Sequence, residues 1–379
     1  MILDRNTILA VYAMISVVLG IILLAAQAKG RIGIWAACWG FGNMAFGLSN
    51  VNQVLKGTVP DLMLVSGENA VCILGYGLIV QGARLLGGRR PRWAALTVAI
   101  VLVAVPVAIA NLPQYKPVRL AYNNLVFIIC DVWVALEAAR LARKERLNTP
   151  WIMAGLFAVT IPFSCQRLHV AVSTLMGADT IDHARVGTWL ATLLATFWSL
   201  RGIVPALIIA ERGNQKLAWL ASHDALTGAL NRAGFDGLRP VLKRQTALVM
   251  MDMDHFKPLN DRYGHAQGDA VLRLLATVVN VHRRDCDAFV RLGGDEFLMV
   301  MPQATAADAG QTAEAIRADF GAATLSLAIA APSPTISIGI AAGDLGQTDL
   351  DMLLTEADKA LYHAKNAGRD RVNLQQLAA

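Results

Sequence analysis

The chain contains 379 residues, of which 55% are hydrophobic and only 16% are charged, and its formal net charge is +6. Average proteins carry about 25% charged residues, so this composition excludes a disordered or collagen-like chain and indicates that much of it lies in lipid. Residues 1–212 hold 18 basic and 9 acidic residues, whereas residues 213–379 hold 16 and 19. The basic half is also the apolar half, so its cations are scattered between hydrophobic segments and form no continuous stripe for a phosphate backbone. We therefore predict no nucleic-acid binding.

The N-terminal half contains seven segments that meet or approach the roughly 20 apolar residues needed to cross a bilayer. They are residues 6–28, 32–55, 62–85, 93–114, 118–140, 151–173 and 186–210. Ten basic residues fall in the loops on one side of these segments and five on the other. By the positive-inside rule, this asymmetry predicts a multi-pass membrane bundle with its N-terminus outside and the polar half of the chain in the cytoplasm.

Several polar residues interrupt these apolar segments, and two interpretations remain open. One is that they form hydrogen bonds between helices. The other is a ligand pocket near the outer face, for which the candidates are Arg167, His169, Asp179, Asp182 and His183. A transporter is disfavoured, because the loops are short and the seven segments show no obvious internal repeat. The N-terminal half resembles no sensor family that we can name, and its residues indicate no particular stimulus.

The connection after Pro205 contains no flexible Gly/Ser linker. Leu217, Leu220 and Ala221 fit one face of a helix, which predicts a short stalk that continues the last membrane segment and brings two copies of the chain together. A single unpaired helix is the alternative. We therefore predict three parts: a membrane sensory domain (residues 1–210), a stalk helix (211–223) and a C-terminal domain (224–379).

Two acidic sites follow strand-like runs in the C-terminal half. The run 246–251 ends in Asp252 and Asp254, and Gly293-Gly294-Asp295-Glu296 separates the apolar stretch 288–290 from the run 297–301. The glycines predict a hairpin turn. If the first strand pairs beside this hairpin, Asp252 and Asp295 lie close together and repel unless a hard cation such as Mg²⁺ lies between them. Such a site suits nucleotidyl transfer. The alternative is a solvated pair of acidic turns.

Polar side chains that suit a purine nucleotide follow the first acid within 17 residues. They are Lys257, Asn260, Asp261, His265 and Asp269. Asn and Asp side chains can read the edge of a purine, and Lys supplies a point charge for phosphate.

The five residues Gly293 to Phe297 spell GGDEF, the signature of the diguanylate cyclase, or GGDEF, family, which the C-terminal half resembles. Four further motifs of the family occur in its order: DALTGALNR at residues 224–232, DMDHFKPLNDRYGHAQGD at 252–269, TISIGI at 335–340 and ADKALYHAKNAGRDRV at 357–372. The resemblance covers about 150 residues. Three departures from the family pattern are minor. Leu292 stands where an aromatic residue is frequent, Pro258 follows the lysine, and Asp370 replaces the commoner Asn.

The resemblance implies an α+β domain with a ferredoxin-like palm sheet, similar to that of polymerases and nucleotide cyclases. The implied reaction condenses two GTP molecules into cyclic di-GMP and releases two pyrophosphates. It requires an antiparallel homodimer, because each domain holds one GTP. The implied localisation is the inner (cytoplasmic) membrane of a bacterium, with membrane lipid around the helical half.

The resemblance also implies the roles of individual residues. Asp252, Asp295 and the backbone carbonyl of Met253 match the ligands of Mg²⁺ or Mn²⁺. Asp295 matches the proton acceptor, and Glu296 beside it matches a residue that positions metal and substrate, so Asp252, Asp295 and Glu296 are the implied catalytic residues. Residues matching those that contact guanine are Asn260 and Asp269, and those matching positions near the nucleotide and its phosphates are Phe256, Lys257, His265, Lys365 and Arg369.

An RxxD sequence, Arg284 to Asp287, lies six residues before the two glycines. Its offset matches the family's inhibitory site, which implies that cyclic di-GMP binds Arg284 and Asp287 and restrains the enzyme. The alternative for this short pattern is a salt-bridged strand edge at the surface.

Two rivals to an active diguanylate cyclase remain. A catalytically silent receptor for GTP or cyclic di-GMP is disfavoured by the intact acidic and guanine positions. A cyclase that closes one nucleotide on itself is disfavoured by the guanine pair and by RxxD.

Overall fold

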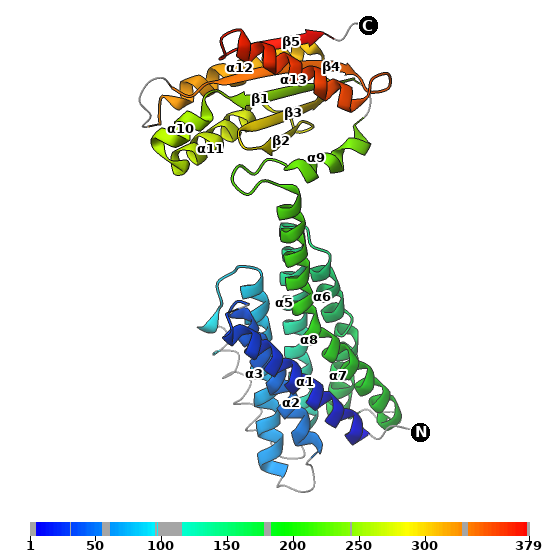
Figure 1. Cartoon of the computed structure of the whole chain (residues 1–379). Helices are drawn as coiled ribbons and strands as arrows, with labels where there is room; N and C mark the ends of the chain where they lie inside the picture. Colours follow the sequence, from blue (N-terminus) through cyan, green and yellow to red (C-terminus); the bar gives the residue numbers. More distant parts are fainter. Residues whose placement is uncertain are drawn as a thin grey trace. The chain divides into compact units, whose positions relative to one another are not determined.

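The computed structural model describes residues 5–30, 32–54, 61–94, 97, 116–177, 183–242, 245–327 and 333–376. It divides into two compact units, Met1–Gly213 and Asn214–Ala379 (Figure 1). The first unit is built of helices, and the second combines helices with a five-stranded sheet.

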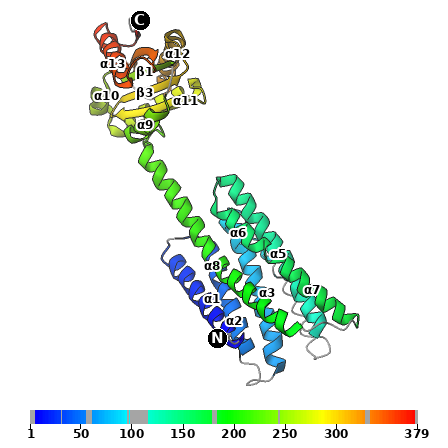
Figure 2. The same cartoon turned by 90° about the vertical axis from the view of Figure 1, so that its right-hand side faces the viewer.

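Long helices make up the described part of the N-terminal unit (Figure 2). They are α1 (Arg5–Ala28), α2 (Trp35–Val54), α3 (Asp61–Leu86), α5 (Lys116–Glu145), α6 (Thr149–Ala158), α7 (Ile161–Leu175) and α8 (His183–Ser222). Glycines let neighbouring helices approach closely. A Cβ at Gly20 or Gly40 would lie within 3.0 Å of the backbone of the other, and the same holds for Gly42 and Gly75. Small residues at such crossings are typical of helices packed in membranes.

Two helical stretches of the described residues are long and apolar enough to cross a membrane: Leu9–Ala28, with mean hydropathy 2.7, and Thr149–Leu175, with mean hydropathy 1.2. The expected number of about seven is therefore not supported. The expected segments 32–55, 62–85, 118–140 and 186–210 do fall on helices, but the polar side chains of α2 and α5 dilute their apolar character. Most of the expected segment 93–114 lies outside the described residues.

Buried ion pairs join the helices of this unit. Arg201 of α8 pairs with Asp131 of α5, with 3.1 Å between Nη1 and Oδ1, and both side chains are at most 6% exposed. Thr160, at the break between α6 and α7, donates to the other oxygen of Asp131 at 2.8 Å. Arg84 of α3 pairs in the same way with the buried Glu137 of α5 at 3.0 Å. Interhelical bonding is thus what the structure shows for these residues.

Of the residues suggested for a ligand pocket, the structure describes the side chains of two. Arg167 and His169 lie on α7 and are exposed. Asp179 and Asp182 lie outside the described residues, and His183 begins α8 with its side chain outside them.

A five-stranded sheet forms the centre of the C-terminal unit, in the order β2-β3-β1-β4-β5. The strands are β1 (Gln245–Met253), β2 (Ala288–Gly293), β3 (Glu296–Pro302), β4 (Ile336–Asp344) and β5 (Val372–Gln376). The helices are α9 (Arg232–Leu238), α10 (Phe256–Tyr263), α11 (His265–His282), α12 (Ala306–Thr324) and α13 (Leu350–Asn366). Antiparallel pairing joins β1 to β3 and β4, and β2 to β3, whereas β5 adds to β4 in parallel.

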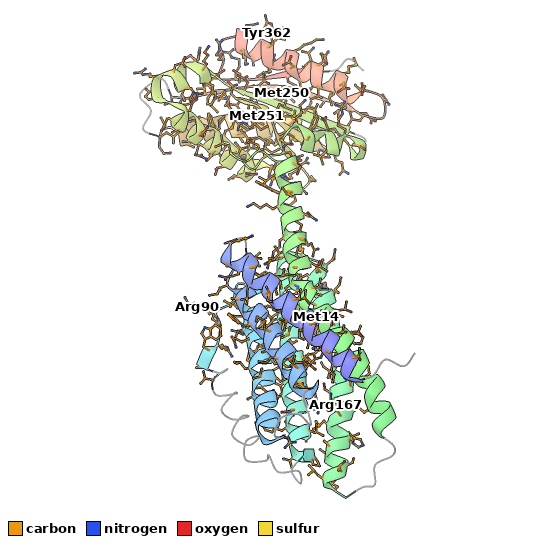
Figure 3. The ribbon with its side chains drawn as sticks, turned by 60° about the horizontal axis from the view of Figure 1, so that its bottom comes forward. Met14, Arg90, Arg167, Met250, Met251 and Tyr362 are labelled. Atoms are coloured by element: carbon orange, nitrogen blue, oxygen red, sulfur yellow. The ribbon has the colours of Figure 1, made fainter. Side chains whose placement is uncertain are left out.

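Both faces of β1 are buried, which explains why its sequence is apolar without alternation. Met251 packs in the core beneath α11 and α12, and Met250 packs in the core beneath α9 and α13 (Figure 3). Since successive side chains of a strand point to opposite faces, one short run fills two cores.

The first four strands and the helices α11 and α12 follow the order βαββαβ, and the four strands lie in the order 4-1-3-2. This is the ferredoxin-like arrangement. The expectation of an α+β C-terminal domain is confirmed. The arrangement brings the end of β1 beside the β2–β3 turn.

Candidate active site

The two acidic motifs meet at one edge of the sheet. Asp252, near the end of β1, lies opposite Glu296 at the start of β3. Gly293 pairs with Glu296, so the turn itself consists of Gly294 and Asp295. Gly294 has φ of +50°, a left-handed conformation that glycine adopts without steric cost. The predicted hairpin is therefore present, with one glycine in the strand and one in the turn.

Burial and like charges act together on Asp252. Burial raises the pKa of this carboxyl above its ordinary value, and the charges of Asp295 and Glu296 raise it further. The ammonium of Lys365 opposes them, with 2.9 Å between Nζ and Oδ2 of Asp252. The carboxylate thus has one cation beside it and two anions nearby, a setting that favours the binding of a further cation.

This donor set fits a divalent metal ion that also binds substrate. Within the described residues, no three His, Cys, Asp or Glu side chains cluster closely enough to hold a metal ion by themselves. Mg²⁺ is commonly held by one or two carboxylates together with substrate phosphates and water. Asp252 and Asp295 supply the carboxylates, and Met253, whose side chain is buried, leaves only its backbone for such a role.

Asn260 of α10 presents an unused acceptor. Its Oδ1 is buried, and no donor among the described residues lies within hydrogen-bonding distance of it. An unsatisfied buried acceptor costs free energy, so a ligand that donates a hydrogen bond there is favoured. The N–H groups of guanine are such donors.

Gly268 of α11 makes room for this amide, a role that the sequence did not suggest. A Cβ at position 268 would collide with the Asn260 side chain and lie 3.2 Å from Phe256 Cζ. The next residue, Asp269, is half-exposed, with Arg273 Nη2 4.0 Å from its carboxylate. Asn260 and Asp269 thus lie on the consecutive helices α10 and α11, with Gly268 at their contact.

The other residues expected near the nucleotide lie on two parts of the domain. Phe256 packs partly buried against the core at the start of α10, Lys257 beside it is exposed, and His265 is exposed at the start of α11. Lys365 lies in the last turn of α13, and Arg369 follows that helix with φ of +61°. The structure brings Lys365 to Asp252.

A network behind the catalytic turn was not predicted from the sequence. Arg291 of β2 donates to the Gly294 carbonyl from Nε at 3.0 Å and from Nη2 at 2.6 Å, and its Nη1 donates to Asp224 at 2.9 Å. Burial raises the pKa of Asp224, but hydrogen bonds from Thr227 and Arg291 outweigh it and leave the pKa below its ordinary value. The DALTG motif, which the sequence marked only by its resemblance, thus reaches the GGDEF turn through one arginine.

Arg284 and Asp287 of RxxD bind each other. Arg284 donates from Nη2 and Nε to the Asp287 carboxylate at 2.7 and 3.1 Å, and its backbone N–H donates to the same carboxylate at 2.8 Å. Arg284 Nη2 also donates to the Pro302 carbonyl at 2.9 Å. The Asp287 carboxylate is fully buried, whereas the Arg284 side chain is 44% exposed. In this conformation the motif is a salt-bridged turn that leads into the edge strand β2, and of the Arg284–Asp287 pair only the arginine reaches solvent.

Comparison with known proteins assigns the C-terminal unit. The family described as "Diguanylate cyclase, GGDEF domain" matches residues 221–371. Diguanylate cyclase DgcM of Escherichia coli K12 is 36% identical over 177 residues, which is 45% of this chain and 42% of that protein. Diguanylate cyclase VdcA of Vibrio cholerae is 38% identical over 158 residues, 40% of this chain and 46% of that one. The chain thus spans less than half the length of these two relatives.

Among solved structures, the GGDEF domain of DgcB from Caulobacter crescentus, determined in complex with c-di-GMP, is 32% identical. It covers 41% of this chain and 95% of that one, with a TM-score of 0.37. The matched motifs all lie in the C-terminal unit, and residues 221–371 of this chain match the GGDEF domain family, with curated diguanylate cyclases among their relatives.

Proposed function

We propose that the protein is a membrane-bound diguanylate cyclase that condenses two GTP molecules into cyclic di-GMP and two pyrophosphates. One observation carries the proposal above all. The end of β1 and the β2–β3 turn bring Asp252 together with Asp295 and Glu296, while the buried Oδ1 of Asn260 awaits a donor. An acidic edge that can bind phosphate through a metal ion and an amide that can bind guanine lie in one domain. This combination suits GTP as the substrate.

Each group then has a defined task. Asn260 and Asp269 accept hydrogen bonds from guanine, while Lys365 and Arg369 bind the phosphates. Asp252, Asp295 and the Met253 carbonyl would hold Mg²⁺ or Mn²⁺, which supplies charge neutralisation and orientation of the phosphate oxygens when bound.

The chemistry of each half-reaction balances without a further reactant. The 3′-oxygen of one GTP forms a bond to the α-phosphorus of the other, and the bond from that phosphorus to the bridging oxygen breaks, so that pyrophosphate leaves. Asp295 takes the proton of the attacking hydroxyl, and Glu296 positions the substrate. Because one domain holds one GTP, two domains must face each other, and their alignment sets the rate.

Exposed side chains support the homodimer and the membrane. Leu217, Trp219 and Leu220, in the last turns of α8, are 43–65% exposed and offer an apolar face to a second stalk. The N-terminal unit exposes large aliphatic side chains along α1 and α5 while it buries ion pairs, which suits lipid as its surroundings. We therefore propose a bundle in a bacterial inner membrane, with more spans than the two apolar stretches, its N-terminus outside and the cyclase in the cytoplasm.

Product inhibition at RxxD completes the proposal. The Arg284 guanidinium is partly exposed beside a fully buried carboxylate, so it is available to a phosphate or guanine of cyclic di-GMP. Binding there would restrain the two domains as product accumulates.

The deciding experiment incubates the purified full chain with GTP and Mg²⁺ and identifies products by mass spectrometry. Cyclic di-GMP is expected from the parent and not from an Asp295→Ala variant. Formation of cyclic GMP alone, or GTP binding without any product, would overturn the proposal.

A further inference from the structure

Asp254 differs from its neighbour Asp252 in how its oxygens are used. Its Oδ1 accepts a hydrogen bond from Ser337 Oγ at 2.7 Å, and its Oδ2 accepts one from Thr335 Oγ1 at 2.8 Å and another from the Asp370 backbone N–H at 3.1 Å. The side chain is 1% exposed. A carboxylate whose two oxygens already accept three hydrogen bonds is poorly placed to bind metal, so a structural role of Asp254 in the site is favoured.

The three donors come from two segments that Asp254 joins to the end of β1. Thr335 directly precedes β4 and Ser337 lies at its start, whereas Asp370 belongs to the loop between α13 and β5. This loop reverses direction with two consecutive non-glycine residues in the left-handed region, Arg369 at φ of +61° and Asp370 at +45°. Such residues cost conformational energy, which the surrounding contacts must compensate.

The loop is braced on both sides of the Arg369–Asp370 peptide. Asp254 holds the Asp370 N–H, and Arg317 of α12 donates to the Asp370 carboxylate at 2.7 Å. The Arg369 N–H donates to the Ala364 carbonyl at 3.1 Å, which ties the preceding peptide, Gly368–Arg369, to α13. The backbone of Arg369 is therefore fixed from the sheet, from α12 and from α13.

The side chain of Arg369 is oriented by the same carboxylate. Its Nε lies 4.0 Å from Asp254 Oδ1, and the side chain is 45% exposed. In the described part of the chain its Nη atoms have no hydrogen-bond acceptor. The Asp254 charge thus draws one edge of the guanidinium inward and leaves the other edge, with its fork of N–H donors, for an anion.

We propose that Asp254 is a positioning residue for the loop between α13 and β5. By holding Arg369 of this loop in place, Asp254 sets the affinity of the site for the β- and γ-phosphates of the nucleotide. The inference rests on the proposed function, because it takes a guanosine triphosphate as the ligand. It predicts that Asp254 affects binding of the triphosphate but not of a nucleotide that lacks these two phosphates.

The test measures binding to the full-length protein in Mg²⁺ by calorimetry, with two probes. The first is the unreactive α,β-methylene analogue of GTP, and the second is GMP. In an Asp254→Asn variant the amide oxygen can still accept from Thr335 and from the Asp370 N–H, and the amide NH2 can donate to Ser337 Oγ. This variant is expected to bind the analogue about tenfold more weakly and GMP as the parent does. Asp344→Asn, the same change at the other end of β4, is the matched control and is expected to change neither affinity.

A double-mutant cycle separates positioning from general disruption. If Asp254 acts through Arg369, adding Asp254→Asn to Arg369→Ala weakens binding of the analogue by less than about twofold beyond Arg369→Ala alone. Equal loss of analogue and GMP binding, or fully additive effects, would overturn the inference.

A second variant keeps the test decisive if Asp254→Asn fails to fold. Thr335→Val removes one donor to the same carboxylate at nearly constant volume, and it is expected to weaken binding of the analogue in the same direction by a smaller factor. Unchanged binding of the analogue in Thr335→Val would then count against the inference. Binding is measured without turnover. A parent protein that makes no cyclic di-GMP would therefore contradict the proposed function, but the binding test of Asp254 could still be carried out.

Discussion

The two units of the molecule distribute charge and apolar surface in opposite ways. In the N-terminal unit Arg201, Asp131 and Glu137 are buried, whereas Met14 and Ile22 of α1 are 61% and 56% exposed (Figure 3). In the C-terminal unit the strands β1, β3 and β4 are largely buried and apolar, and the hydrophobic core of the described residues contains no charged side chain. The first unit thus exposes apolar side chains and buries ion pairs, whereas the second encloses an apolar core.

The buried Asp252 of the C-terminal unit is compensated less completely than the buried charges of the helical unit. In the helical unit buried charges are paired across helices and hold them together, as Arg201 holds α5 and α8. In the C-terminal unit, the buried Asp252 has Lys365 beside it but also lies near two like charges, and burial together with these charges raises its pKa. Pairing marks structure, whereas an incompletely compensated charge marks a binding site.

The largest effect is expected for Asp252→Asn. Activity should fall by roughly 10³-fold or more, because a metal ligand is lost. Stability should not fall. Since the pKa of Asp252 is raised in the folded protein, its ionised form opposes folding above that pKa, and the opposition disappears as pH falls through it. The variant is therefore expected to unfold at the same or a higher temperature near pH 7, with the difference shrinking in acid.

Cyclic di-GMP formation and thermal unfolding of the full chain check this prediction, with Asp344→Asn as control. A clear drop in the unfolding temperature at pH 7 would show that Asp252 stabilises the fold. Its buried charge would then not differ in role from the buried charges of the helical unit.

Arg201→Leu is expected to destabilise the helical unit by about 3–5 kcal/mol, because it leaves the buried Asp131 without its cation. Replacing both Asp131 and Arg201 by Leu is expected to cost much less, since no uncompensated charge remains. Unfolding of the full chain in detergent, followed by circular dichroism, provides the measurement. Additive costs in the double variant would mean that the two side chains act independently.

Arg284→Ala is expected to relieve product inhibition and leave the initial rate of cyclic di-GMP formation unchanged. The guanidinium is the exposed member of the RxxD pair, and its removal takes away the donors for the product. Progress curves with added cyclic di-GMP check this, with Arg273→Ala of α11 as a basic-residue control. If the variant stops at the same product plateau as the parent, the motif is only a salt-bridged edge.

The smallest effect is expected at the start of α12, where Thr305 and Asp308 form a capping box. Thr305→Ala should cost about 1 kcal/mol of stability. Hydrogen bonds from the Thr305 backbone N–H and hydroxyl hold the pKa of Asp308 below its ordinary value, so its contribution is present above the ordinary pKa and lost as pH falls through the depressed one. Hydrogen exchange of α12 at pH 7 checks the variant. Unchanged protection there would mean that tertiary packing alone holds this helix end.

The acidic edge could be predicted from the sequence because strand pairing is nearly determined by pattern. Glycines between two apolar runs fixed the hairpin, and placing β1 beside it brought Asp252 to Glu296. The polar pattern after Asp252 includes Asn260 among residues that suit a purine, and the family resemblance implies its contact with guanine. Its unused oxygen was not foreseeable, because that depends on how closely α11 approaches at Gly268.

Long-range pairs escaped prediction for the same reason. Asp131 and Arg201 lie 70 positions apart, and only packing of α5 against α8 shows that they meet. Asp254 was recorded only as the end of a strand, since its partners come from β4 and from the loop after α13. Apolar length alone overestimated the number of spans supported by the described helices.

If Asp252 binds metal and Lys365 binds phosphate, as the proposed function requires, the ion pair between them couples the binding of metal and of nucleotide thermodynamically. A metal ion that binds without nucleotide must separate Lys365 from the Asp252 carboxylate, which leaves the lysine ammonium without an acceptor. Nucleotide arriving with the metal offers phosphate oxygens to the released ammonium, so the cost of separation is recovered. Each ligand therefore raises the affinity for the other, and by linkage the two increments are equal. The site then discriminates between free metal ions and metal-loaded nucleotide before any chemistry begins.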